Sequence, residues 1–532
     1  MTEDPERLSW REAGQWKLQS AREHANPFVD IDVEGAFRSP SGAQFSVPGF
    51  YDGDGAWRVR FSPGEAGKWT YRISSRPHDP GLAGDGAFTV GPAEGRGFLR
   101  VTPGEAWGFR HESGEPVLIF GDTTYNLFGM EHCGGPVHEF LKRRASQGIN
   151  LLRVRLPVSP YHPPEGYSDW QTRRTWPWGG SEQCPQFDRF NLDYFRSVDR
   201  VMDWCEGLGI GLEMVMEAWG FEFPFNRRDV FVAEWEELWL RYLIARYDAY
   251  RSVWFWTLMN EYEYYPNGDW RWQGPVSDLW AMRVGRWVKR VAPHGHIISV
   301  HNGPGEPPFA ERFSKDPGAV ECVMFQSWGT ADAQSGWLAA GIEEAIARSL
   351  GGWGGSAVFA EYGYERNPDL YAKFPYHNHC DVDHTRRGGW RGLFGGLGLI
   401  HGWEHSWGPW MILDRDQAGM PQFLLMQRFF REVAPFDRVR PAPELVAGDY
   451  EWGRRPSALA DRSRALVAVY LPTGGRVRLR LPGAKRYRAE WFDTRTGRMR
   501  RAQATAGKSP NYSAPAGGGE RPWDWILVLR AK

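Results

Sequence analysis

The stretch SVWFWTLMNE, residues 252–261, has the pattern that decides the fold: an apolar, strand-forming run that ends in two polar residues. Seven other stretches are also apolar and strand-forming, and helical patterns separate them. In chain order the eight predicted strands are VLIFGDTT (117–124), INLLRVRL (149–156), IGLEMVMEAW (210–219), SVWFWTLMNE (252–261), HIISVHN (296–302), ECVMFQSW (321–328), SAVFAEYGYE (356–365) and LGLIHGWEHSW (397–407). Strands that alternate with helices predict a parallel sheet, and eight are what a closed (β/α)8 barrel needs.

The segment before the third strand shows the expected helix most clearly. Apolar residues fall at spacings of three and four in Leu192, Phe195, Val198, Met202 and Cys205. Such spacing places them on one face of a helix. Asn191 is expected to cap its start and Gly207 its end. The same face predicts that Cys205 is a core residue rather than a metal ligand.

All-β segments are expected on both sides of the barrel. Before it, residues 1–95 alternate apolar with polar residues between turn signals, and residues 437–532 return to this alternation. The fold class is therefore α/β, with a barrel over 96–436 between two β-sandwiches, 1–95 and 437–532. We expect the sandwiches to support the barrel rather than bind a ligand themselves, since neither shows an exposed aromatic row.

Composition narrows the choice of partners. The 532 residues include 64 basic and 65 acidic ones without a run of like charge, which argues against nucleic acid or anionic membrane partners. No segment reaches about 18 consecutive apolar residues. The first residues lack a signal-peptide pattern, so a cytoplasmic location is expected unless a signal was removed. Five scattered cysteines predict reduced thiols. The oligomeric state is open.

Aromatic residues make up 15% of the chain, including 29 Trp. Flat sugar faces stack on such rings, which favours carbohydrate as the partner, although large β-domains and barrels also pack many aromatics.

The strand ends hold the candidate site, because all loops after the strands of a barrel open on one face. The polar and aromatic residues at these ends are Asp122, Arg153, Glu217, Asn260, Glu261, His301, Trp328, Glu361, Trp403 and His405. Buried polar groups at this density are costly unless they bind something.

Two carboxylates stand out, Glu261 at the end of the fourth strand and Glu361 at the end of the seventh. A glutamate pair across a pocket is what glycosidic bond cleavage requires. Asn260, beside the first of them, could donate to a sugar hydroxyl next to the reacting carbon. The alternative is that each glutamate forms a salt bridge with a loop arginine.

These residues resemble a known family. WTLMNEYEY and FAEYGYE look like the strand-four and strand-seven motifs of the retaining (β/α)8 glycoside hydrolases, and GDTTYNLF resembles the apiosidase-like group among them. The segment NPFVDIDVEGAFRSPSG resembles the Ig-like domain that often precedes such barrels, and EWFDTRTGRM resembles the collagen-binding-like β-sandwich that closes them. Many relatives are secreted, so the missing signal pattern favours an imported oligosaccharide or glycoside over an extracellular polymer.

The resemblance implies that Glu261 is the acid/base and Glu361 the nucleophile of a retaining hydrolase. Carboxyl groups about 5 to 5.5 Å apart go with this mechanism. Glu261 must then stay protonated near neutral pH while Glu361 stays ionised, which predicts a bell-shaped rate profile. No cofactor is expected.

The remaining candidates have structural alternatives. Asp122 could accept hydrogen bonds from two sugar hydroxyls, or cap the following loop. Arg153 needs an anionic partner, either Glu361 or another acid on the barrel floor.

Other strand-end residues are candidates for sugar contacts. We expect His301, Trp328, Trp403 and His405 to bond or stack with sugar, Trp403 by stacking. Tyr125, Trp219 and Glu217 belong either to the site or to the barrel wall.

The segment HNHCDVDH, residues 377–384, is rich in potential metal ligands, but its spacing matches no zinc signature. We expect no metal there, and expect Asp383 to cap the helix before the eighth strand.

Three rival functions are compatible with a sugar-binding barrel. A non-catalytic carbohydrate-binding protein would keep the polar opening of the barrel but have no catalytic activity. A transglycosylase would use the same residues as a hydrolase. A lyase acting on uronic acids is disfavoured, because the glutamate pair gives no reason for it.

Overall fold

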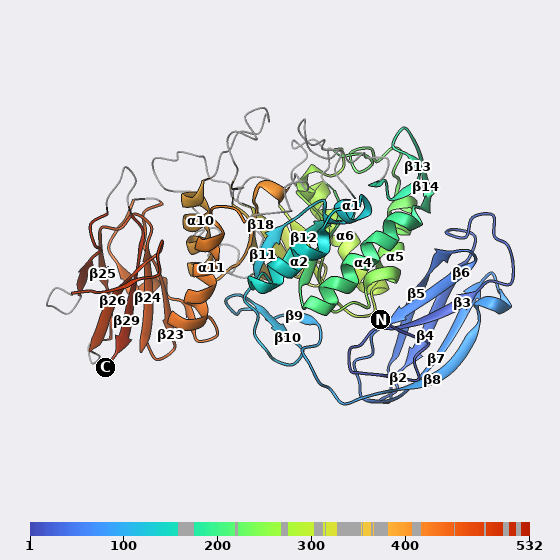
Figure 1. The fold of residues 1–532 in the computed structure, drawn as a ribbon, viewed down its shortest axis with the longest axis horizontal. Coiled ribbons are helices and arrows are strands. Elements are labelled where there is room, and N and C mark those ends of the chain that lie inside the picture. The colour runs from blue at the N-terminus through green and yellow to red at the C-terminus, as the bar shows by residue number, and fades with distance from the viewer. Residues whose placement is uncertain are drawn as a thin grey trace.

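The computed structural model shows a central barrel between two β-rich domains (Figure 1). It describes residues 1–157, 175–218, 222–267, 275–302, 312–313, 315–326, 353, 355–362, 365, 381–406, 416–451, 453–482, 486–503, 510–517 and 523–532.

The barrel is closed by eight parallel strands, which confirms the predicted fold class. Their order around the ring follows the chain, so each strand pairs with the next and the eighth with the first. The strands are β11 (Phe120–Thr123), β12 (Leu151–Arg155), β15 (Gly211–Glu217), β16 (Val253–Met259), β17 (Ile297–His301), β18 (Cys322–Gln326), β19 (Ser356–Glu361) and β20 (Gly398–His401). All eight stretches predicted as strands contribute one each.

Toward the amino-terminal ends of the strands, the barrel interior is an apolar core. Polar side chains follow toward the carboxyl ends. Leu151, Phe255, Met324 and Ile400 belong to one buried cluster. Two residues further along β12 the inward position is Arg153. Side chains alternate between the two faces of a strand, so the apolar floor and the polar mouth come from the same inward positions.

Helices cover the outside of the barrel (Figure 1). They are α1 (Leu127–His132), α2 (Val137–Ser146), α4 (Leu192–Leu208), α5 (Ala233–Tyr247), α6 (Pro275–Val291), α10 (Val382–Phe394) and α11 (Met420–Arg428). Asn191 caps α4 as predicted, since its side chain accepts a hydrogen bond from the backbone N–H of Tyr194. Cys205 is fully buried in the core, also as predicted.

Two predicted helix caps were wrong. Gly207 lies inside α4, and Gly209 ends the helix in the left-handed conformation at φ 69°. Asp383 lies in the first turn of α10, and Asp381 is the residue that accepts from the backbone N–H of His384. In both cases the true cap is the residue two positions away that has the required backbone conformation.

The N-terminal domain is a β-structure with strand order β1-β3-β6-β5-β4-β7-β8-β2. Its strands are β1 (Thr2–Glu3), β2 (Arg7–Leu8), β3 (Gly14–Gln19), β4 (Asp32–Arg38), β5 (Gln44–Gly53), β6 (Ala56–Phe61), β7 (Gly67–Arg76) and β8 (Gly84–Val90). Trp16, Phe37, Trp57 and Trp69 are buried in its core. Much of its aromatic content therefore serves packing.

The C-terminal domain has a six-stranded and a three-stranded sheet, of orders β21-β23-β24-β29-β26-β27 and β22-β25-β28. Its strands are β21 (Val439–Pro441), β22 (Val446–Ala447), β23 (Ser457–Asp461), β24 (Leu466–Leu471), β25 (Arg476–Leu479), β26 (Tyr487–Asp493), β27 (Met499–Arg501), β28 (Asn511–Ser513) and β29 (Trp525–Ala531). Asp524, fully buried, forms an ion pair with Arg386 of α10 at 2.9 Å. This domain is thus joined to the barrel by a buried charge pair.

Two hairpins complete the fold, β9 (Leu99–Val101) with β10 (Phe109–His111) and β13 (Trp178–Ser181) with β14 (Cys184–Phe190). Within the described ranges, none of the helices has the length and apolar character that crossing a membrane requires.

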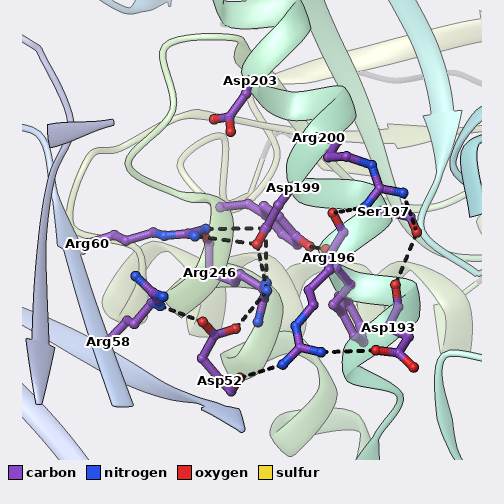
Figure 2. A network of polar contacts seen from close by, with 12 residues as sticks. Asp52, Arg58, Arg60, Asp193, Arg196, Ser197, Asp199, Arg200, Asp203 and Arg246 are labelled. Atoms are coloured by element: carbon purple, nitrogen blue, oxygen red, sulfur yellow. Dashed lines mark hydrogen bonds and ion pairs between the residues drawn. The ribbon is translucent and has the colours of Figure 1, made fainter. Parts of the chain in front are cut away.

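An ion network joins the N-terminal domain to the barrel (Figure 2). Asp199 of α4 contacts Arg246 of α5 at 2.6 Å and Arg60 of β6 at 3.4 Å. Asp52 of β5 also reaches Arg246, at 3.0 Å. Burial alone would raise the pKa of Asp199, but Arg246 and Arg60 outweigh it and lower this pKa to about 2. One carboxylate therefore bridges arginines of both domains.

We predict that Asp199→Asn destabilises the junction, because it leaves two buried guanidiniums short of a counter-charge. Breaking a buried pair costs about 3 kcal/mol or more, and Asp52 keeps the loss near the lower end. Differential scanning calorimetry should show a lower unfolding midpoint. Proteolysis should cleave the chain sooner in residues 91–97, which lie between β8 and β9. The wild-type contribution is present above pH about 4 and fades as the pH falls toward 2.

Asp193→Asn is the matched control. Asp193 also lies on α4 and pairs with an arginine, Arg196 at 3.0 Å, but its side chain is 79% exposed. We expect no measurable change in the midpoint, as for exposed pairs in general. Equal effects of the two substitutions would contradict the proposed importance of the buried bridge.

Candidate functional site

Six of the predicted residues meet in one buried cluster at the carboxyl ends of the strands. They are Tyr125 after β11, Arg153 of β12, Asn260 and Glu261 after β16, His301 of β17 and Glu361 of β19. The fourth and seventh strands of the ring thus supply the two glutamates, as the sequence predicts.

Glu361 is surrounded by hydrogen-bond donors. Its Oε2 lies 3.4 Å from Arg153 Nη1, 3.2 Å from His301 Nε2 and 3.3 Å from the Tyr125 hydroxyl. A cation and two neutral donors favour the charged form of a carboxylate. Arg153 also lies 3.5 Å from Glu213 on the barrel floor, so it pairs with both kinds of acid that the sequence left open.

Glu261 lies in different surroundings. It accepts one hydrogen bond from Gln326, at 3.0 Å, and is buried. Burial, and next the charge of Glu361, raise the pKa of Glu261 to about 8. At neutral pH Glu261 is therefore protonated, while Glu361 has the contacts of an anion.

His301 connects the two glutamates. Its Nδ1 accepts a hydrogen bond from the backbone N–H of Glu261 at 3.4 Å, and its Nε2 faces Glu361. Burial, and next the charge of Arg153, lower the pKa of His301 to about 4. The imidazole is thus neutral, with its proton on the nitrogen that faces Glu361. His301 supports the backbone at Glu261, which has a left-handed φ of 51°.

The two polar atoms of the Asn260 side chain differ in their hydrogen bonds. Its Oδ1 accepts from Arg153 and lies 3.5 Å from the Tyr125 hydroxyl. Its Nδ2 is buried and finds no hydrogen-bond partner in the part of the chain that the structure describes. Arg153 fixes the orientation of the amide, so Nδ2 is the group left to donate to a ligand.

Asp122, Trp403 and His405 form a second group, outside the barrel interior. Asp122 contacts Arg144 of α2 at 2.6 Å and His405 at 2.9 Å, and it has no exposed surface. The Arg144 guanidinium lies over the Trp403 ring at 5.6 Å. In this structure these three residues contact helix α2, and Asp122 does not cap the following loop.

Glu217 belongs to a third group. It pairs with Arg228 at 2.5 Å, and Arg228 also contacts Glu236 of α5 at 2.7 Å. Burial raises the pKa of Glu217 to about 8, although Arg228 opposes this.

Several sequence-predicted residues lie outside the described residues: Trp219, Trp328, His377, His379 and Cys380. Of the histidine-rich segment, the structure describes 381–384, where Asp381 and His384 form a capping box and Asp383 pairs with Arg386. In the described ranges, no group of three or more His, Cys, Asp or Glu is arranged to hold a metal ion.

Sequence reasoning missed Gln326 and Glu213. Gln326 ends β18 at the same level as Glu361, with which it pairs in the strand register. Both residues are polar and occur in otherwise apolar strands, and that was the available signal. Chemically, the main cluster places a carboxyl group with a raised pKa and a carboxyl group beside a cation next to a free amide donor, which is an arrangement for acid/base and nucleophilic steps.

Three protein-family models match successive parts of the chain. The model described as "Apiosidase-like, catalytic domain" matches residues 106–420. A domain of unknown function matches residues 9–76, and the "putative collagen-binding domain of a collagenase" matches 441–530. A comparison with curated proteins gave no match.

Solved structures share the fold. A crystal structure of a "putative glycoside hydrolase" from Bacteroides vulgatus is 19% identical, with a TM-score of 0.73, and the match covers 99% of this chain and 100% of the other. A glycoside hydrolase family 5 structure from the same species is 16% identical, with a TM-score of 0.59, and the match covers 82% and 93%.

We predict that Glu361→Gln lowers the pKa of Glu261, because it removes the negative charge that helps to raise it. Carboxyl titration by ¹³C NMR of glutamate-labelled protein should show the resonance near pH 8 moving to lower pH. Glu217 titrates in the same range, so Glu261→Gln is needed to assign the signal. An unchanged Glu261 titration in Glu361→Gln would show that the two carboxyl groups do not interact.

Proposed function

The chain belongs to the apiosidase-like family and is a glycosidase, and we propose from this premise that it cleaves an O-glycosidic bond in two displacements with retention of configuration. One observation carries the proposal: Glu261 and Glu361 lie in one cluster but in opposite electrostatic surroundings. Glu361 contacts a cation and two further donors, whereas burial raises the pKa of Glu261 to about 8.

In the first displacement, the Glu361 carboxylate attacks the anomeric carbon and the bond to the leaving oxygen breaks. Glu261 gives its proton to that oxygen, so the aglycone leaves as an alcohol. In the second displacement, Glu261 takes a proton from water, the water oxygen attacks the anomeric carbon, and Glu361 is released as a carboxylate.

The substrate in this proposal is an oligosaccharide or a glycoside. Asn260 Nδ2 would donate to a hydroxyl beside the anomeric carbon, where hydrogen bonds strengthen in the transition state. The cation of Arg153 keeps Glu361 ionised for attack, and His301 orients it. Transglycosylation would use the same residues with a sugar in place of water.

We predict that a screen of aryl and disaccharide glycosides, in both anomers and with pyranose and furanose rings, identifies at least one cleaved substrate. Glu361→Gln and Glu261→Gln should each lower kcat/KM on it by at least about 10³-fold, because each removes a reacting group. Product analysis by NMR should show retained configuration, and excess acceptor sugar reveals transglycosylation.

Glu263→Gln serves as the control for the screen. Glu263 is buried two residues from Glu261, but pairs with Arg312 at 2.6 Å. It should keep turnover. If no glycoside is cleaved and one sugar binds equally to wild type and both variants, the protein is a carbohydrate-binding protein instead.

The pH profile gives a separate prediction. Glu261 must be protonated for the first displacement, so kcat/KM should fall as the pH rises through about 8. The acidic limb should follow the protonation of Glu361. A basic limb that remains when Glu261 is replaced would contradict this assignment.

A further inference from the structure

The barrel interior contains a buried acid that the proposed mechanism does not use. Glu213 lies on β15, points into the barrel and has no exposed surface. A buried carboxyl group in an apolar floor is costly unless its neighbours compensate it. The contacts of Glu213 therefore indicate why it is present.

Glu213 is held from one side by two hydroxyl groups. The Thr257 hydroxyl donates to Oε1 of Glu213 at 2.9 Å, and it lies 2.6 Å from the hydroxyl of Ser299. Since Thr257 uses its proton toward Glu213, Ser299 donates to Thr257. Strands β16 and β17 thus fix the carboxyl group in position.

On its other side Glu213 faces Arg153. The Arg153 Nε lies 3.5 Å from Oε1 of Glu213, while Nη1 reaches Glu361 and Nη2 donates to Asn260. Each edge of the planar guanidinium thus faces a different residue. A contact on the Nε side limits rotation of the plane, and so sets the direction of the two groups that reach the active site.

The charges give a second reason for the contact. One buried cation lies between two carboxyl groups, Glu361 above and Glu213 below. If Glu361 becomes a neutral glycosyl ester, as the proposed function requires, Arg153 loses the charge of that partner. Glu213 still lies within ion-pair distance of the guanidinium and can keep it from turning away.

We propose that Glu213 is a positioning residue of the glycosidase site: it holds the Arg153 guanidinium so that one cation serves Glu361 and Asn260 through both displacements. This rests on the proposed function. Glu213 does not touch the substrate, and its effect reaches the reaction only through Arg153.

Within the described residues, several titratable and polar groups face this pair. Glu361 faces Tyr125, Arg153, His301 and Glu261, and Glu213 faces Arg153, Thr257 and the Cys322 thiol of β18. Burial raises the pKa of Glu213, Arg153 opposes this, and the charge of Glu361 adds to the rise. The two carboxyl groups therefore repel each other.

We predict that Glu213→Gln, which keeps the shape and the acceptor for Thr257, lowers kcat by about 10- to 100-fold through misplacement of Arg153, with little change in KM. The acidic limb of the pH profile should stay in place, because the pKa of Glu213 is raised and its carboxyl group is already neutral where Glu361 titrates. In Glu361→Gln, the Glu213 carboxyl resonance, assigned with Glu213→Gln, should titrate at lower pH in ¹³C NMR, because the charge of Glu361 is gone.

Two variants complete the test. Glu236→Gln, at another buried and arginine-paired glutamate, should leave kcat in place even if stability falls. Thr257→Val removes the hydrogen bond that holds Glu213 but keeps its carboxyl group, so kcat should fall. If Glu213→Gln does not fold, Thr257→Val decides alone.

Unchanged kcat in Thr257→Val, or an unmoved Glu213 titration in Glu361→Gln, would overturn the role of Glu213. The titration needs no substrate. Absence of turnover in the wild type would therefore count against the proposed function, and the NMR result would still decide whether Glu213 and Glu361 interact across Arg153.

Discussion

The contacts of one buried guanidinium, that of Arg153, organise the centre of the barrel mouth. It is the cation beside Glu361, it fixes which end of the Asn260 amide stays free, and it contacts the floor acid Glu213. A charge can be buried at this depth only with partners on several sides. These partners come from β15, β19 and the end of β16, so closure of the barrel is what makes the site possible.

The barrel could be predicted from sequence because its signal repeats. Eight apolar stretches separated by helical patterns all indicate a parallel barrel, so a wrong assignment of one stretch would not change the predicted fold. Helix ends have no such redundancy. Gly207 and Gly209, like Asp381 and Asp383, are chemically equivalent candidates, and only the backbone conformation at each position decides which one caps.

The sequence indicated which strand ends carry polar candidate residues. It did not indicate on which face of its strand each of these side chains lies. Asp122 and Glu361 look alike in sequence, yet the first faces helix α2 and the second the barrel axis. A register shift next to Gln326 skips Ala360 on β19, so that Gln326 pairs with Glu361. Such an irregularity has no pattern in the sequence, whereas Gln326 continues the inward alternation of Cys322 and Met324 and was overlooked although it is a polar residue in an apolar strand.

The left-handed backbone at Glu261 has an evolutionary consequence. A non-glycine residue in this conformation costs about 1 to 2 kcal/mol relative to glycine. Selection for stability alone would favour glycine or asparagine here, so under the proposed function the glutamate is retained for its chemistry. A lineage that lost its substrate would therefore gain stability by drifting at this position first, so the residue found there records whether a descendant still works as an enzyme.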